Sequence, residues 1–196
     1  MILEFRDMTH HDAGPVRIRR LWPSDRAAVE AHFARLDRET RFNRFMGAVS
    51  PEGARAYGAA ALGRAGLVYG AFVGGELRGV GEIRPAGSGG LGPEGEAALT
   101  VEAAYRRRGI GTALARRLCA AARHARVERL HLRTLAGNRA LLALARRLGA
   151  ELAVAGHEAH ALLRVAPPTP LSAWAEYLDG IVEVVLAAVE ARPARA

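Results

Sequence analysis

A short stretch in the middle of the chain combines arginines and glycines in a spacing that suits the binding of a phosphate. Residues 97–101 are rich in β-forming side chains, and a turn with three successive arginines leads from them to Gly109 and Gly111. Glycine has no Cβ atom, so a ligand can come close to the backbone. The free N–H groups of a helix's first turn point toward such a ligand, with the positive end of the helix dipole behind them. The sequence therefore predicts an anion cradle at the start of a helix.

Other phosphate-binding motifs fit this stretch less well. A dinucleotide-binding fingerprint needs a third glycine where Leu114 stands, and it follows its strand directly, whereas residues 102–108 intervene here. The G-K-[ST] signature of a P-loop does not occur in the chain. The remaining alternative is an ordinary glycine-containing loop beside solvated arginines.

The pattern R-x-x-G-x-G, with a valine five residues before the arginine, resembles the pyrophosphate loop of the GNAT superfamily of N-acetyltransferases. This resemblance covers about residues 16–165 and implies acetyl-CoA as the co-substrate. It implies that the pyrophosphate lies on the N–H groups of residues 108–112. The residues expected to bind the cofactor are Val101, Arg106, Arg107, Arg108, Gly109, Ile110, Gly111, Thr112 and Asn138.

Two further segments carry the same resemblance. Residues 32–47 are similar to the helical hairpin that begins the acetyltransferase domain of bacterial protein-lysine acetyltransferases, where it forms a wall of the acceptor site; a purely structural hairpin is an equally good interpretation. Asn138 and Leu148-Gly149 follow in the order usual for the superfamily. Ala150 replaces the usual aromatic residue after that glycine.

Acyl transfer from a thioester to an amine requires a base, because the amine arrives protonated, and a donor for the oxyanion that forms. In the proteins that this chain resembles, a glutamate at the beginning of the cofactor strand is the base, and Glu96 opens that strand here. Glu82, on the neighbouring strand, is the alternative, and Glu102 is expected at the surface. A reaction without a side-chain base also stays possible.

The departing thiolate is commonly protonated in the superfamily by a tyrosine seven residues after the asparagine, and that position is Ala145 here. Water, Tyr105 or Tyr69 could supply the proton instead, or the thiolate leaves unprotonated. Protein acetyltransferases often lack this tyrosine, which slightly favours a protein lysine over a small-molecule amine as the acceptor. The missing tyrosine also leaves room for a different function, a domain that binds acyl-CoA without catalysis.

Composition excludes several other classes of protein. The net charge of +8 comes from arginine alone, and because the arginines are spread along the chain with few aromatic residues, we expect no nucleic-acid partner. A single cysteine, Cys119, favours a reducing compartment, and the absence of a signal peptide or membrane span predicts a cytoplasmic protein. Neither His157 and His160 nor the pair at residues 10–11 has zinc-site spacing, so no metal is expected.

The order of elements predicts a mixed α/β fold with the central sheet of the GNAT type and an extra C-terminal helix. Residues 1–166 would form the acetyltransferase domain, with Ser24 and Ser50 as helix N-caps and Gly47 ending a helix. Residues 167–196 would form a proline-rich linker and an amphipathic helix beginning at Ser172. The apolar stripe of that helix predicts docking on the domain itself or a homodimer.

Overall fold

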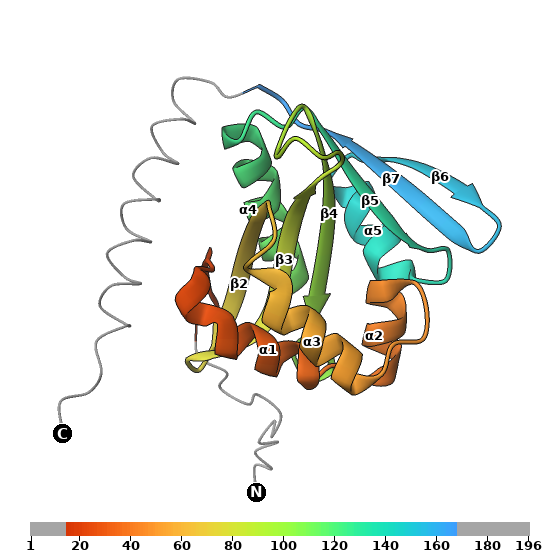
Figure 1. The fold of residues 1–196 in the computed structure, drawn as a ribbon. Helices are drawn as coiled ribbons and strands as arrows, with labels where there is room; N and C mark the ends of the chain where they lie inside the picture. Colours follow the sequence, from red (N-terminus) through yellow and green to blue (C-terminus); the bar gives the residue numbers. More distant parts are fainter. Residues whose placement is uncertain (1–14, 168–196) are drawn as a thin grey trace, which may run out of the picture.

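The computed structural model describes residues 15–167 and contains one seven-stranded sheet with helices on both faces (Figure 1). The strand order is β1-β2-β3-β4-β5-β7-β6. The strands are β1 (Arg17–Arg20), β2 (Leu67–Val73), β3 (Glu76–Pro85), β4 (Glu94–Val101), β5 (Arg129–Leu135), β6 (Glu151–Ala155) and β7 (Glu158–Arg164). The helices are α1 (Arg26–Ala34), α2 (Arg38–Phe45), α3 (Pro51–Ala61), α4 (Ile110–His124) and α5 (Arg139–Arg147), with short 3-10 turns at Pro23–Asp25 and Ala103–Tyr105. The predicted mixed α/β fold is confirmed.

The strands β2, β3 and β4 form an antiparallel meander that begins with a tight hairpin. Gly74 and Gly75 connect β2 to β3 with φ angles of 59° and 81°, the left-handed region that a two-residue hairpin turn requires. The meander continues through a full register between β3 and β4. It therefore holds β4 in place along its whole length.

The strands β4 and β5 are parallel neighbours that separate toward their carboxyl ends. Their register runs only from Glu94 opposite Arg129 to Glu96 opposite His131, although β4 continues to Val101 and β5 to Leu135. The helix that follows each strand, α4 or α5, begins at this separated end (Figure 1). Ligands of open α/β sheets bind outside the carboxyl ends of diverging strands, so this gap is the natural place for one.

Two apolar clusters fix the layers on the two faces of the sheet. On one face, Ile110, Leu114 and Leu118 of α4 pack on Ala97 and Val101 of β4. On the other face, Val29 and Phe33 of α1 pack on Val68 and Val80 with α3 beside them. Burial of side chains of this size stabilises the fold by about 1.5–3 kcal/mol each. The gap between β4 and β5 thus has α4 and α5 on one side and α1, α2 and α3 on the other (Figure 1).

Some predicted helix ends are confirmed and others are wrong. Ser50 caps α3, since its Oγ accepts a hydrogen bond from Gly53 N at 3.0 Å. Ser24 is not a cap, because it lies inside a 3-10 turn that Asp25 closes by accepting from Trp22 N. The left-handed residue that ends α2 is Met46, with φ 54°, and not Gly47.

Two predictions lie outside the described residues. These are the helix expected from Ser172 and the histidines at positions 10 and 11. The division of the chain at residue 166 stays a prediction for the same reason. Within residues 15–167 no helix is long and apolar enough to cross a bilayer.

Candidate active site

The two glycines of the predicted anion cradle, Gly109 and Gly111, lie at the start of α4. Gly109 is the N-cap of this helix and has a φ angle of 79°, which side-chain-bearing residues rarely adopt. A Cβ atom added at Gly111 would meet only Leu99 and Val101, both at 3.9 Å. Packing within the protein therefore does not require a glycine at position 111. The N–H groups of the first turn of α4 suit a pyrophosphate.

The three arginines of the loop divide into two kinds. Arg106 is engaged within the protein: its guanidinium donates to Thr40 Oγ1 and to the Val101 carbonyl oxygen, and it lies 3.5 Å from a carboxylate oxygen of Asp37. Arg107 and Arg108 are exposed at the mouth of the cradle. Arg106 thus fastens the loop to the N-terminus of α2, whereas the side chains of Arg107 and Arg108 face solvent.

Asn138 occupies a structural position next to the gap. Its Oδ1 accepts from Leu141 N at 3.2 Å, which caps α5, and its Nδ2 donates to Thr134 Oγ1 at 3.0 Å. Both ends of the amide are thus used inside the protein. The side chains of Val101 and Ile110 belong to the core on the α4 face, so only their backbone groups can contact a ligand.

Glu96 is exposed, and its side chain points to the face opposite α4. Successive side chains of a strand point to opposite faces of the sheet, so Glu96 and Thr100 share one face and Ala97 lies on the other. Ala97 packs against α4, whereas Thr100 contacts His32 of α1. Glu96 is the third residue of β4 and not its first, since β4 begins at Glu94. It lies where the pairing with β5 ends, beside the gap.

Glu82 lies on the same face but is closed off from solvent, with 1 % of its surface exposed. Its carboxylate accepts from Arg44 and Arg84 and from the Tyr57 hydroxyl at 2.8 Å. Burial alone would raise the pKa of Glu82, but the charges of Arg44 and Arg84 outweigh burial and hold it below its usual range. A buried, doubly paired carboxylate makes a weak and inaccessible base. Glu82 instead fastens α2 and α3 to the sheet.

Glu102 forms a second buried network, which the sequence does not reveal. It was expected at the surface and is 8 % exposed, with hydrogen bonds from Arg35 at 2.8 Å and Arg78 at 3.0 Å. His32 is fully buried beside it, with Nδ1 3.2 Å from Glu102 and Nε2 2.9 Å from Thr100. Burial lowers the pKa of His32, despite the neighbouring Glu102 carboxylate. The one sequence signal is a histidine on the otherwise apolar face of α1.

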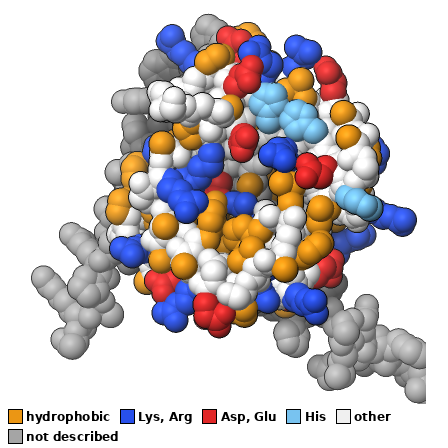
Figure 2. Space-filling model, turned by 45° about the vertical axis from the view of Figure 1, so that its right-hand side comes forward, with side chains coloured by type: hydrophobic (Ala, Val, Ile, Leu, Met, Phe, Trp, Pro, Cys, Tyr) orange, Lys and Arg blue, Asp and Glu red, His pale blue; other side chains and the backbone are white. Residues whose placement is uncertain are grey.

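A pair of histidines lies on the same face as Glu96. His131 is the register partner of Glu96 on β5, and its ring stacks on His160 of β7 at 5.1 Å between centroids. His131 Nδ1 lies 3.1 Å from His160 Nε2, and its Nε2 lies 3.3 Å from a carboxylate oxygen of Glu94. Figure 2 shows two adjacent histidines surrounded by arginine and acidic side chains on this face. No sequence spacing indicated this contact, because the two residues meet through strand pairing.

Neither tyrosine considered as an acid lines the pocket that Ala145 lines. Tyr69 is buried on β2 under Arg117, two strands away from β4. Tyr105 follows β4, and its ring is flanked by Arg78 at 4.6 Å and Arg108 at 5.2 Å. Ala145 is buried and faces the gap from the α5 side. Across residues 15–167, no group of three or more potential metal ligands occurs.

Comparison with known proteins agrees with this geometry. The model of the acetyltransferase (GNAT) family matches residues 30–150, and the chain belongs to this family of acetyltransferases, whose acyl donor is acetyl-CoA. A sequence comparison with curated proteins gives no match.

Solved structures share the fold at low sequence identity. The GNAT domain of S. lividans PAT has a TM-score of 0.65 at 19 % identity, over 77 % of this chain and 91 % of that one. The protein yncA from Salmonella typhimurium, solved with its cofactor acetyl-CoA, has a TM-score of 0.60 at 19 % identity, over 80 % and 99 %. Ribosomal-protein-alanine N-acetyltransferase from Brucella melitensis has a TM-score of 0.58 at 22 % identity, over 76 % and 99 %.

Proposed function

We propose that this protein transfers the acetyl group of acetyl-CoA to a primary amine, either a protein lysine or a small-molecule amine, by direct attack on the thioester. The observation that carries the proposal is the position of Glu96. Its carboxylate is exposed beside the gap between β4 and β5, on the face away from the cradle's helix α4. An acceptor can therefore reach the gap from one side while the donor enters it from the other.

The residues of the chain then have separate roles. Bound acetyl-CoA supplies the activated thioester. The first turn of α4, with Arg107 and Arg108, holds the phosphates. Glu96 takes a proton from the acceptor ammonium, directly or through a water, so that the free amine can attack the carbonyl carbon. Backbone N–H groups on the unpaired edge of β4 beyond Glu96 are suited to stabilise the oxyanion. The carbon–sulfur bond then breaks, and the thiolate takes up a proton from water.

The face that the acceptor would approach is set by the two buried networks. The ion pairs of Glu82 and Glu102 hold α1 and α2 on the face of the sheet that carries Glu96, and Tyr57 of α3 donates a hydrogen bond to Glu82. The fixed helices support a defined acceptor wall, which favours the substrate interpretation of residues 32–47. A homodimer through the C-terminal helix and a cytoplasmic location stay predictions from the sequence.

One observation favours a second candidate function, a domain that binds acyl-CoA without catalysis. Ala145 stands where the family commonly has the tyrosine acid, and neither Tyr69 nor Tyr105 replaces it. The two functions are separated by measuring thermal stabilisation by acetyl-CoA together with transfer to a panel of lysine peptides and small amines. Transfer to any of these amines supports the enzyme. Stabilisation by acetyl-CoA without transfer to any of them would favour the binding domain.

A further inference from the structure

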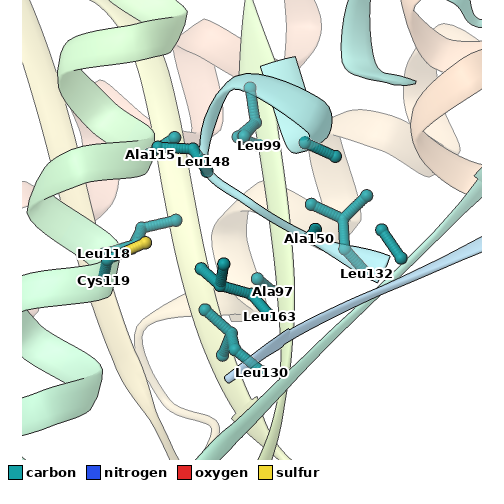
Figure 3. A pocket seen from close by; sticks show the side chains of 12 residues that line it. Ala97, Leu99, Ala115, Leu118, Cys119, Leu130, Leu132, Leu148, Ala150 and Leu163 are labelled. Carbon is teal, nitrogen blue, oxygen red and sulfur yellow. The ribbon is translucent and has the colours of Figure 1, made fainter. Parts of the chain in front are cut away.

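An apolar cavity lies between α4 and α5 at the gap (Figure 3). Side chains of β4, β5 and β7 form its floor, and Leu118 and Cys119 of α4 form one wall. Its volume is about 30 Å³. Since one water-sized group needs about 10–15 Å³, the cavity has room for about two such groups. It is larger than the small voids of an ordinary close-packed core.

The cavity exists because alanines line it where larger side chains would fill it. Five of its twelve lining residues are alanine, and two of these, Ala145 and Ala150, lie next to each other. Gly149, with φ 81°, reverses the chain after α5, so that Ala150 N donates to the Ala145 carbonyl oxygen at 3.0 Å. These are the two positions at which the sequence departs from the family pattern of a tyrosine and an aromatic residue. Both departures therefore open the same space.

The cavity is within reach of a donor bound at the cradle. Leu118 and Cys119 follow Gly111 by seven and eight residues, which is about 11–12 Å along a helix. An extended pantetheine arm exceeds this length. Leu99 lies 3.9 Å from the position that a Cβ atom at Gly111 would take, and it also lines the cavity, so the cradle and the cavity are neighbours along β4. The acyl end of the donor must lie in the gap for an amine near Glu96 to reach it.

We propose that this cavity accepts the acyl chain of the donor, and that the protein prefers straight aliphatic acyl groups of three or four carbons over acetyl. The inference rests on the proposed function, because it assigns the acyl group of that same site. Among the lining side chains only Cys119 carries a polar atom, and burial raises the pKa of its thiol, so it stays neutral. The cavity therefore offers no partner for a charged acyl group such as succinyl, whose carboxylate would be buried unpaired.

The expected size of the preference follows from the volume. Each buried methylene contributes about 0.8 kcal/mol, which corresponds to about a fourfold gain in affinity. With room for about two groups, propionyl-CoA should bind up to about 4-fold and butyryl-CoA up to about 15-fold more tightly than acetyl-CoA. Hexanoyl-CoA should lose this gain because its chain exceeds the cavity.

The test is calorimetric titration of the full chain with coenzyme A and its acetyl, propionyl, butyryl, hexanoyl and succinyl thioesters, without any acceptor. Ala145→Val should fill the cavity and reduce the butyryl-to-acetyl affinity ratio to about one. Ala143→Val is the matched control, because it places the same side chain on the exposed face of the same helix. Ala150→Val repeats the test outside α5, should the helical variant fail to fold. Leu148→Ala should enlarge the cavity and restore the affinity for hexanoyl-CoA.

The results separate this inference from the proposed function. A wild-type protein that binds butyryl-CoA no more tightly than acetyl-CoA overturns the inference, even if it transfers acetyl to amines. An Ala143→Val variant that changes the ratio as much as Ala145→Val also overturns it. Tighter butyryl binding that disappears in both cavity variants supports it. If butyryl-CoA binds more tightly in this way but no acyl group is transferred to any amine, the inference stands and only the proposed function is contradicted.

Discussion

Glu82 and Glu96 lie on the same face of the sheet, but replacing them by glutamine should have different effects. Glu82→Gln should lower the stability of the fold, whereas Glu96→Gln should lower turnover. Glu82 is 1 % exposed, and its two arginine partners are 13 % and 17 % exposed. Breaking a buried ion pair by removing one partner costs about 3–5 kcal/mol, because the remaining charge stays buried and unpaired. For a protein of this length each kcal/mol lowers Tm by about 2–4 °C. Glu82→Gln should therefore lower Tm by roughly 6–20 °C.

Glu96→Gln should leave Tm within about 2 °C of the wild type, since substitution of an exposed side chain usually changes stability by less than about 0.5 kcal/mol. Turnover should fall by about 10² to 10⁴, as expected for removal of a general base, with little change in acetyl-CoA affinity. Differential scanning calorimetry, initial rates and binding titrations measure the three quantities.

The matched control is Glu30→Gln. Glu30 pairs with Arg55 at 2.7 Å on the surface, and exposed pairs contribute about 0–1 kcal/mol, so this variant should change neither quantity much. The reasoning is refuted if Glu82→Gln keeps the wild-type Tm and loses turnover. That result would make Glu82 the base. Full activity of Glu96→Gln at neutral pH would remove Glu96 from the mechanism.

Three further predictions test other parts of the structure. Gly111→Glu should abolish acetyl-CoA binding, because its side chain fills the cradle and carries the same negative charge as the phosphates. Gly111→Ala should fold normally, because its Cβ atom has room. Acetyl-CoA affinity that survives in the glutamate variant, measured by calorimetry, would contradict the cradle. The pKa of His32 in the folded state is below the unfolded value of 6.5, so its contribution to stability is present above pH 6.5 and is lost as the pH falls through the folded value. Denaturation at a series of pH values should show a slope of up to about 1.4 kcal/mol per pH unit there, which His32→Asn removes and the exposed control His157→Asn keeps. Deleting residues 171–196 should convert a dimer to a monomer in light scattering if the predicted C-terminal helix forms the contact, and a dimer that persists would exclude that contact.

Local signals in the sequence predicted the parts of the fold that depend on backbone conformation. The N-cap Ser50 and the glycine Gly109 at the start of α4 were both found where the sequence placed them. Each of these features is decided by residues within a few positions along the chain. Met46 shows the limit of such signals, because it adopts the left-handed conformation next to a glycine that seemed the better candidate.

Long-range contacts decided what the sequence could not predict. The sequence offered both Glu82 and Glu96 as the base, and the contacts of Glu82 with Arg44, 38 residues away, and with Tyr57, 25 residues away, mark it as a buried structural carboxylate. The contact of His32 with Glu102 spans 70 residues, and that of His131 with His160 depends on the register of β5 and β7. Ala145 and Ala150 were each visible as departures from a family pattern, but no local pattern indicated that they line one cavity.

The separation of β4 from β5 divides the sheet into two parts along a weak seam. Three register pairs join these strands, against seven between β3 and β4 and seven between β5 and β7. The two helices that follow these strands pack on different parts of the sheet, α4 on β2, β3 and β4 and α5 on β6 and β7, while α2 contacts both β4 and β5. Amide hydrogen exchange along β5 and β7 should therefore occur through an opening that leaves the β1–β4 part folded. A ligand in the gap crosslinks the two parts, and at 100 times its Kd it adds about 2.7 kcal/mol to their stability. Resistance of this protein to proteolysis should accordingly follow the supply of acyl-CoA.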